Sequence, residues 1–194
     1  LATNLIQGSG TGFDVLWPHD ALGFAQAFAW VTDAPNGGSG DYFDPVPAVG
    51  PNMVFDLGSD VGLGEISFWG YSDNNANGAN LFRLRFATSA DGPNGFGTSI
   101  SYSPEFASIQ DQTQRQSFEF DQGVFARYVE WVPLDNFFGI NPPGGDRVGA
   151  GEIAFAVRAV DNEIDILSIA RGADDVTLTF KSRDGLSYAI FRSP

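Results

Sequence analysis

The chain contains no cysteine, and among its 194 residues there is only one histidine and one methionine. The missing thiols exclude disulfides, cysteine nucleophiles and cysteine-based zinc sites. His19 is therefore the only histidine that could serve a nucleophile, and no serine lies in a G-x-S-x-G setting. We expect a protein without catalytic activity, in which His19 has a structural or binding role. No apolar run approaches the roughly 20 residues that span a bilayer, so membrane insertion is not expected.

Positive charge is also scarce, because 10 basic residues stand against 24 acidic ones, for a formal net charge of −14. Phosphate backbones and anionic membrane surfaces are repelled by such a surface, which argues against nucleic acid as a partner. The hydrophobic content of 43% and the aromatic content of 14% indicate a folded domain. The chain begins at Leu1 and lacks a signal-type apolar stretch, which favours a processed or excised form whose natural N-terminus lies elsewhere.

Helical periodicity is nearly absent, and residues 19–31 have room for a turn or two at most. The 24 glycines and 11 prolines separate short segments in which apolar and polar residues alternate. In "LFRLRFATS" the apolar Phe82, Leu84 and Phe86 alternate with arginines. The same alternation recurs over 53–57, 66–68, 118–120, 129–131 and 153–157. This pattern predicts an all-β fold, an antiparallel β-sandwich or jelly roll.

The sequence pattern changes after Val160. We predict a jelly-roll domain over residues 1–160 and a short β extension over 161–194, with three strands in the segments 161–175, 176–182 and 186–194. About thirty residues of sheet bury too little apolar surface to be stable alone. The extension therefore either packs on the first domain or begins a second β domain. We favour the second domain, because the chain stops directly after a strand.

Four segments carry a family resemblance through their order and spacing, with a weaker fifth before them. They are "AWVT" (29–32, the weaker one), "MVFDLG" (53–58), "ATSADG" (87–92), "ARYVEW" (126–131) and "GGDRVGAGEIAF" (144–155). In these segments the chain resembles the discoidin family, that is, the coagulation-factor type C domains and the galactose-binding-like jelly-roll carbohydrate-binding modules. The resemblance covers roughly residues 4–158. It implies a non-catalytic β-sandwich that binds ligands with the loops at one end.

Two further expectations concern the later segments. The resemblance implies that "GGDR" is the last loop and "EIAF" the closing strand, which returns alongside the N-terminal segment. In "ARYV", the planar guanidinium of Arg127 is expected to pair with a carboxylate such as Asp146 or with a loop carbonyl.

The resemblance also implies a structural Ca²⁺, held by carbonyls and an acid of the N-terminal loop together with a carboxylate on the last strand. On this sequence the two acids are Asp20 and Glu152. The chain departs from the family pattern at Phe28, where the family usually has a hydroxyl residue. Calcium needs six to eight oxygen ligands, so these acids form a site only if they converge. The cluster "SDNN" (72–75) is a second candidate, although a solvated turn is favoured there.

Three long loops, over 32–51, 71–80 and 135–147, interrupt the strand pattern, and loops of this length are more often functional than idle. A sugar site combines an aromatic platform with amide, acidic, arginine or histidine side chains. The candidate ligand-binding residues are Tyr71, Asn74, Asn75, Phe137, Phe138, Arg147 and His19. Phe137 and Phe138 are the most suggestive pair, because two consecutive residues cannot easily both be buried from a strand. Alternatively, the loop aromatics plug the end of the sandwich.

From these features we expect an extracellular bacterial carbohydrate-binding module within a larger secreted or surface protein. Its partners would be a glycan, such as a cell-surface or matrix polysaccharide, and the other domains of its parent chain. The acidity of the chain argues against polyanionic glycans. Two alternatives remain open: a structural or cell-adhesion spacer without a sugar site, and the accessory domain of a hydrolase whose catalytic domain lies outside this chain.

Overall fold

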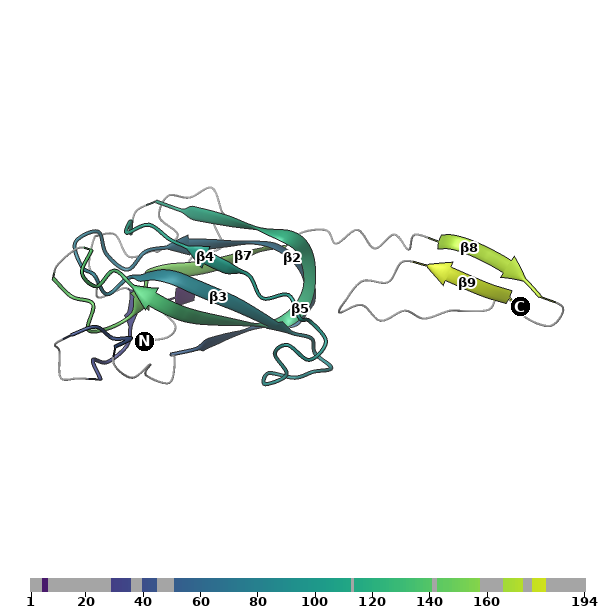
Figure 1. The fold of residues 1–194 in the computed structure, drawn as a ribbon, viewed down its shortest axis with the longest axis horizontal. Coiled ribbons are helices and arrows are strands. Elements are labelled where there is room, and N and C mark those ends of the chain that lie inside the picture. Colours follow the sequence, from purple (N-terminus) through teal and green to yellow (C-terminus); the bar gives the residue numbers. More distant parts are fainter. Residues whose placement is uncertain are drawn as a thin grey trace.

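Nine strands and no α-helix make up the secondary structure of residues 5–6, 29–35, 40–44, 51–112, 114–140, 143–157, 166–172 and 176–180, which the computed structural model describes. The strands are β1 (Trp30–Val31), β2 (Met53–Trp69), β3 (Ala79–Ala87), β4 (Glu105–Ala107), β5 (Gln116–Asn136), β6 (Gly149–Ala150), β7 (Glu152–Val157), β8 (Ile166–Arg171) and β9 (Val176–Phe180). The expected all-β class is confirmed (Figure 1). Within the described part, no helix has the length and apolarity needed to cross a membrane.

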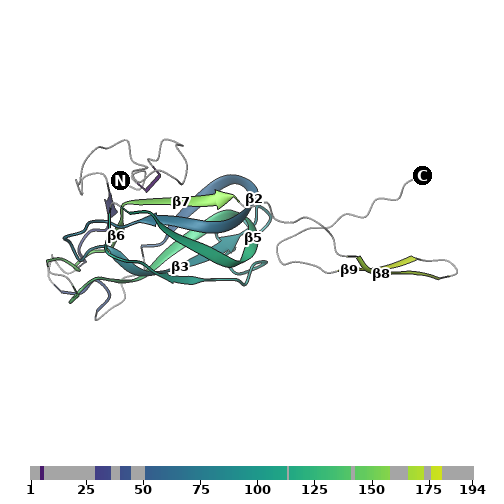
Figure 2. The same ribbon diagram turned by 90° about the horizontal axis from the view of Figure 1, so that it is seen from above.

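Two long strands build both layers of the sandwich. The antiparallel order is β4-β3-β5-β2-β7, and β2 and β5 contain 17 and 21 residues. The first part of β2, Met53–Asp56, pairs with the part of β5 that also pairs with β3. The second part of β2 pairs with the beginning of β5 and, on its other side, with β7. Both strands therefore pass from one layer to the other, and β5 turns sharply at one end of the sandwich (Figures 1 and 2).

A register shift between Asp56 and Val61 marks the corner in β2. Gly58 has a φ of +84° there, which a side chain would disfavour, and its N–H donates to the Asp56 carboxylate at 2.9 Å. The Arg127 guanidinium, one residue from Tyr128, the β5 partner of Asp56 in the ladder, donates to the same carboxylate at 2.7 and 2.9 Å. Arg127 therefore pairs with a carboxylate as expected, but with that of Asp56 instead of Asp146, because the register places Asp56 beside this arginine.

Aromatic rings join the two layers. Phe82 of β3 stacks on Phe68 of β2 with ring centroids 5.1 Å apart, and it meets Phe118 of β5 edge to face at 5.6 Å. Trp131 packs on both Phe68 and Phe82. The alternation predicted for β3 is confirmed, because Phe82, Leu84 and Phe86 are completely buried. The sandwich core therefore follows from period-two patterning in strands from both layers.

Two small sheets complete the described structure. β1 pairs with β6, so that Trp30 lies opposite Ala150. Because Ala150 comes just before the start of β7, the beginning of β7 lies close to residues 30–31. β8 pairs with β9 in a sheet of its own, and these two strands lie in the segments 161–175 and 176–182 where strands were expected. The third expected strand, over 186–194, lies outside the described residues. The division into 1–160 and 161–194 stays a prediction.

Replacing Phe82 by alanine removes the ring that contacts both layers. We expect Phe82→Ala to lower the free energy of unfolding by about 3–5 kcal/mol, the usual loss for a fully buried phenylalanine. Urea denaturation measures this loss. The control is Ile109→Ala, at an exposed loop position, where a change within about 0.5 kcal/mol is expected.

Hydrogen bonds from Arg127 and, to a smaller extent, from the Gly58 N–H lower the pKa of Asp56 from 3.8 to about 2. A carboxyl whose pKa is lowered by folding stabilises the folded state above its unfolded pKa, and that contribution disappears as the pH falls towards 2. Asp56→Asn should therefore lose less stability than the wild type between pH 4.5 and 2.5. Urea denaturation at several pH values measures the difference, and Asp121→Asn controls for the change in net charge. Equal slopes for wild type and Asp56→Asn would contradict the assignment.

Candidate functional site

The strand register gathers several loops at one end of the sandwich. Ala79 at the start of β3 lies opposite Asn136 at the end of β5, and Trp69 at the end of β2 lies opposite Glu152 at the start of β7. The loops over 70–78 and 137–148 therefore extend from the same end of the sandwich. Backbone bonds join them directly, from the Ala76 N–H to the Pro143 carbonyl at 3.0 Å and from the Phe137 N–H to the Ala76 carbonyl at 3.1 Å.

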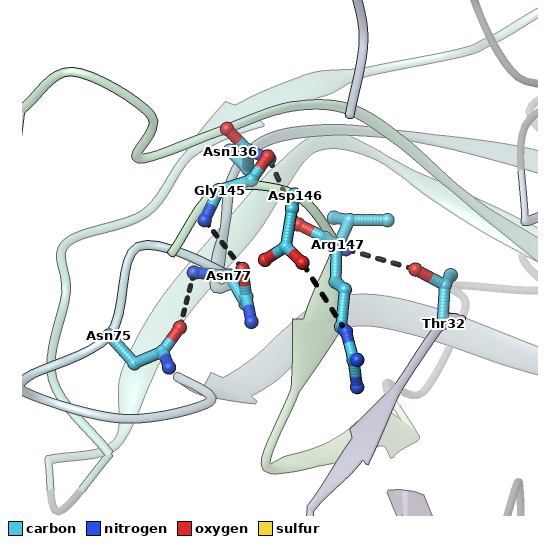
Figure 3. A network of polar contacts seen from close by, with 8 residues as sticks. Thr32, Asn75, Asn77, Asn136, Gly145, Asp146 and Arg147 are labelled. Carbon is cyan, nitrogen blue, oxygen red and sulfur yellow. Dashed lines mark hydrogen bonds and ion pairs between the residues drawn. The ribbon is translucent and has the colours of Figure 1, made fainter. Parts of the chain in front are cut away.

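The peptide groups of Gly145 lie at the centre of these loops (Figure 3). Its N–H donates to the Asn77 side-chain oxygen at 2.5 Å. Its carbonyl accepts from the Asn136 side-chain amide at 2.7 Å and from the Tyr42 N–H at 2.8 Å. Asn136 also donates to the Arg147 carbonyl at 2.9 Å. Three loops that are distant in sequence thus meet at one backbone segment.

This arrangement requires glycine at position 145. Its φ is +95°, and a Cβ there would lie 2.5 Å from the Cδ2 atom of Phe138. The ring of Phe138 therefore lies against the bare backbone of the loop. With 45% of its surface exposed, Phe138 presents an aromatic ring to solvent. Phe137, one residue earlier, is buried against Gly78, so only one ring of the pair is available at the surface.

Asp146 and Arg147 project from the same turn, between Asn77 on one side and Thr32 on the other (Figure 3). The Nε of Arg147 lies 3.7 Å from a carboxylate oxygen of Asp146, a loose contact for an ion pair. The arginine side chain is 43% exposed, and the aspartate side chain is 18% exposed. The turn is fixed on the Thr32 side, because the Val148 N–H donates to the Thr32 hydroxyl at 3.1 Å.

Two tyrosines lie beneath this turn. Tyr71 is buried, and burial raises the pKa of its hydroxyl, while the charge of Arg147 lowers it and that of Asp146 raises it. Burial also raises the pKa of Tyr42, whose hydroxyl hydrogen-bonds to Thr32. The site therefore combines an exposed phenylalanine ring, a cationic donor and an anionic acceptor with two buried tyrosines. Such a surface can bind a ligand that has both hydroxyl groups and an apolar face.

The candidate residues from the sequence fall into different environments. Phe138 and Arg147 are exposed side chains of the same loop, and Asn75 lies in the adjoining one. Asn74, next to Asn75, is exposed and its N–H bonds to the Ser72 hydroxyl at 3.4 Å. Tyr71 and Phe137 are buried, at 7% and 8% exposure. His19 lies outside the described residues. Ligand binding by any of these residues stays a prediction.

Sequence reasoning missed the structural role of the two asparagines that hold the site together. Asn136 and Asn77 are buried, at 2% and 6% exposure, and Asn77 bonds to a residue 68 positions away. No spacing rule links asparagines that are so far apart in the chain. The only local signal was the polar Asn136 directly after an alternating strand, where the side chain can bond to nearby backbone groups.

The structure tests the two predicted calcium sites, Asp20 with Glu152 and the cluster 72–75, to different extents. Glu152 is buried at 2% exposure, whereas Asp20 lies outside the described residues. In the part of the chain that the structure describes, no group of three or more acidic, histidine or cysteine side chains could hold a metal ion. In the cluster 72–75, Asp73 accepts from the Gln112 N–H at 2.6 Å and Asn75 accepts from the Asn77 N–H at 2.9 Å. These side chains therefore fold the turn, as favoured from the sequence, and calcium at Asp20 and Glu152 stays a prediction.

No protein-family model and no curated protein matches the chain. Among solved structures, it is similar to the family 32 carbohydrate-binding module of AlyQ in complex with 4,5-unsaturated mannuronic acid, with 18% identity and a TM-score of 0.46 over 80% of this chain and 85% of the other. It is also similar to a family 32 module of C. perfringens NanJ in complex with galactose, with 13% identity and a TM-score of 0.43 over 66% and 74% of the two chains. A Bacteroides fragilis F5/8 type C domain has 12% identity and a TM-score of 0.45 over 66% and 71%. Two of these solved domains are carbohydrate-binding modules and one is an F5/8 type C domain.

Proposed function

We propose that the end loops of the sandwich bind a glycan, and that the domain acts as a non-catalytic carbohydrate-binding module. The observation that carries this proposal is the half-exposed ring of Phe138, seated on the backbone of Gly145 in the same loop as Arg147. A solvent-exposed ring costs hydrophobic free energy unless a ligand covers it. The C–H face of a pyranose is a surface that covers such a ring while its hydroxyl groups remain free to pair.

The same loop also carries polar groups for those hydroxyls. The guanidinium of Arg147 supplies donors, and the Asp146 carboxylate supplies acceptors next to them. Because the two side chains are 3.7 Å apart at their closest polar atoms, most of their hydrogen-bonding groups remain available to a ligand. Asn74 and Asn75, on the adjoining loop, are further candidates for hydroxyl contacts. Tyr71 and Phe137 would support the site from below, because both are buried.

The charge at this end favours a neutral ligand. In the described loop residues 29–35, 40–44, 70–78, 135–140 and 143–148, Arg147 is the only basic residue beside six aspartates, at 33, 41, 44, 73, 135 and 146. A sulfated or uronic acid polymer would meet repulsion along most of this rim. We therefore place neutral glycans first as ligands. The same proposal puts the domain outside the cell, as part of a larger secreted or surface protein.

A glycan array followed by calorimetric titration of the best-bound neutral glycan tests the proposal. We expect Phe138→Ala to weaken binding by about tenfold or more, since stacking and ring burial at a site centre are worth about that factor. Arg147→Met should weaken binding to a similar extent, because it removes the donors but keeps an apolar stem. Both variants should keep the wild-type melting temperature, since both side chains are exposed.

The matched control is Val157→Ala, which removes an exposed apolar side chain at the far end of β7 from Glu152. Its affinity should equal that of the wild type. Binding that is unchanged in Phe138→Ala and Arg147→Met would place the site elsewhere on the domain. An array without any bound glycan would instead favour a spacer or adhesion domain, or an accessory domain with a structural role.

Removal of calcium tests the proposed metal site at Asp20 and Glu152. If the ion binds the folded state, chelation should lower the melting temperature by several degrees, because a ligand stabilises the state that binds it. Glu152→Gln should abolish that calcium-dependent shift. Identical melting curves with chelator and with excess Ca²⁺ would remove calcium from the proposal.

A further inference from the structure

Asn136 is the one described side chain whose polar atoms bond on both sides of the Phe138–Arg147 loop. Its oxygen accepts from the Phe138 N–H at 2.9 Å, and its amide donates to the carbonyls of Gly145 and Arg147 at 2.7 and 2.9 Å. The first bond fixes the backbone that presents the ring, and the last fixes the backbone that presents the guanidinium. The Asn136 side chain is only 2% exposed and its bond to the Gly145 carbonyl is buried, so solvent does not compensate for the loss of that bond.

Asn77 holds the same loop from the opposite side. Its oxygen accepts from the Gly145 N–H at 2.5 Å, and its own N–H donates to the Asn75 side chain at 2.9 Å (Figure 3). Gly145 is thus held at its N–H by Asn77 and at its carbonyl by Asn136. A loop held on both faces by buried amides has little conformational freedom to lose when a ligand binds.

From this geometry we infer that Asn136 is a positioning residue for ligand recognition, and that with Asn77 it holds Phe138 and residues 145–147 in their binding conformation before any ligand arrives. The ligand role rests on the proposed function, whereas the ordering of the loop does not. Removal of Asn136 frees Phe138 and Arg147 together, so one substitution at a residue beneath the surface should affect both groups that face the ligand.

The experiment compares Asn136→Ala and Asn77→Ala with the wild type. NMR-detected hydrogen exchange should show the amides of Phe138, Gly145 and Tyr42 exchanging about tenfold faster or more in Asn136→Ala, while Leu84 and Val129 in the sandwich core keep their wild-type rates relative to global unfolding. In Asn77→Ala the Gly145 amide should show the largest increase. Calorimetric titration with the best-bound neutral glycan of the array should show affinity about tenfold weaker in Asn136→Ala.

Thr88→Val is the matched control. Thr88 is buried, and its hydroxyl donates to Asp91 at 2.8 Å. It directly follows the end of β3 opposite to Ala79, and it lies about 31 Å from Ala79 at about 3.4 Å per residue. Thr88→Val should lower the melting temperature but leave the loop amides and the glycan affinity unchanged.

The outcomes separate the two ideas. Unchanged exchange at Phe138 and Gly145 in Asn136→Ala would overturn the inference, and so would equal effects from Thr88→Val. Unchanged glycan affinity in Asn136→Ala, with binding by the wild type intact, would also overturn it. If the wild type binds no glycan but the loop amides still exchange faster, the proposed function fails and the role of Asn136 in ordering the loop stands.

Discussion

The bend shared by β2 and β5 is the constraint on which the other features depend. Because both strands change layers, the pairing of one half of each strand sets the pairing of the other half. The corner combines Gly58, whose positive φ permits the turn, with the Asp56–Arg127 pair that links the two strands. Backbone sterics and one charged contact at the corner thereby determine which strand ends, and hence which loops, meet at the opposite end of the sandwich.

The aromatic core follows from this geometry. Phe68 and Phe118 belong to one layer and Phe82 to the other, and the rings meet in the stacked and edge-to-face arrangements that aromatic pairs prefer. Large rings at these positions fill the space between layers with few side chains, which suits a chain rich in phenylalanine and poor in long aliphatic residues. A core built in this way holds the two layers rigidly, so that the end loops start from fixed positions.

The end loops depend on small and amide residues as well as on buried aromatic rings. Gly145 admits the ring of Phe138 against its backbone, and Gly149 lets the chain pass close to the Trp30 carbonyl, where a Cβ would lie 2.4 Å away. The buried amides of Asn77 and Asn136 satisfy peptide groups that the irregular backbone leaves unpaired. The same contacts that satisfy the backbone also leave Phe138 and Arg147 at the surface, so stability and the proposed recognition rest on one network.

The sequence alone was enough to establish the all-β class, the inward-facing residues of β3 and, to within a few residues, the loops that follow β2 and β5. Alternation is a local property, and it reports burial without knowledge of the partner strand. The tertiary structure was needed to show that Arg127 pairs with Asp56. It was also needed to show that Phe137 is buried while Phe138 is exposed. The same holds for the convergence of Asn77, Asn136 and Gly145. These outcomes depend on the register between strands far apart in the chain, and a shift of one residue would change every such contact.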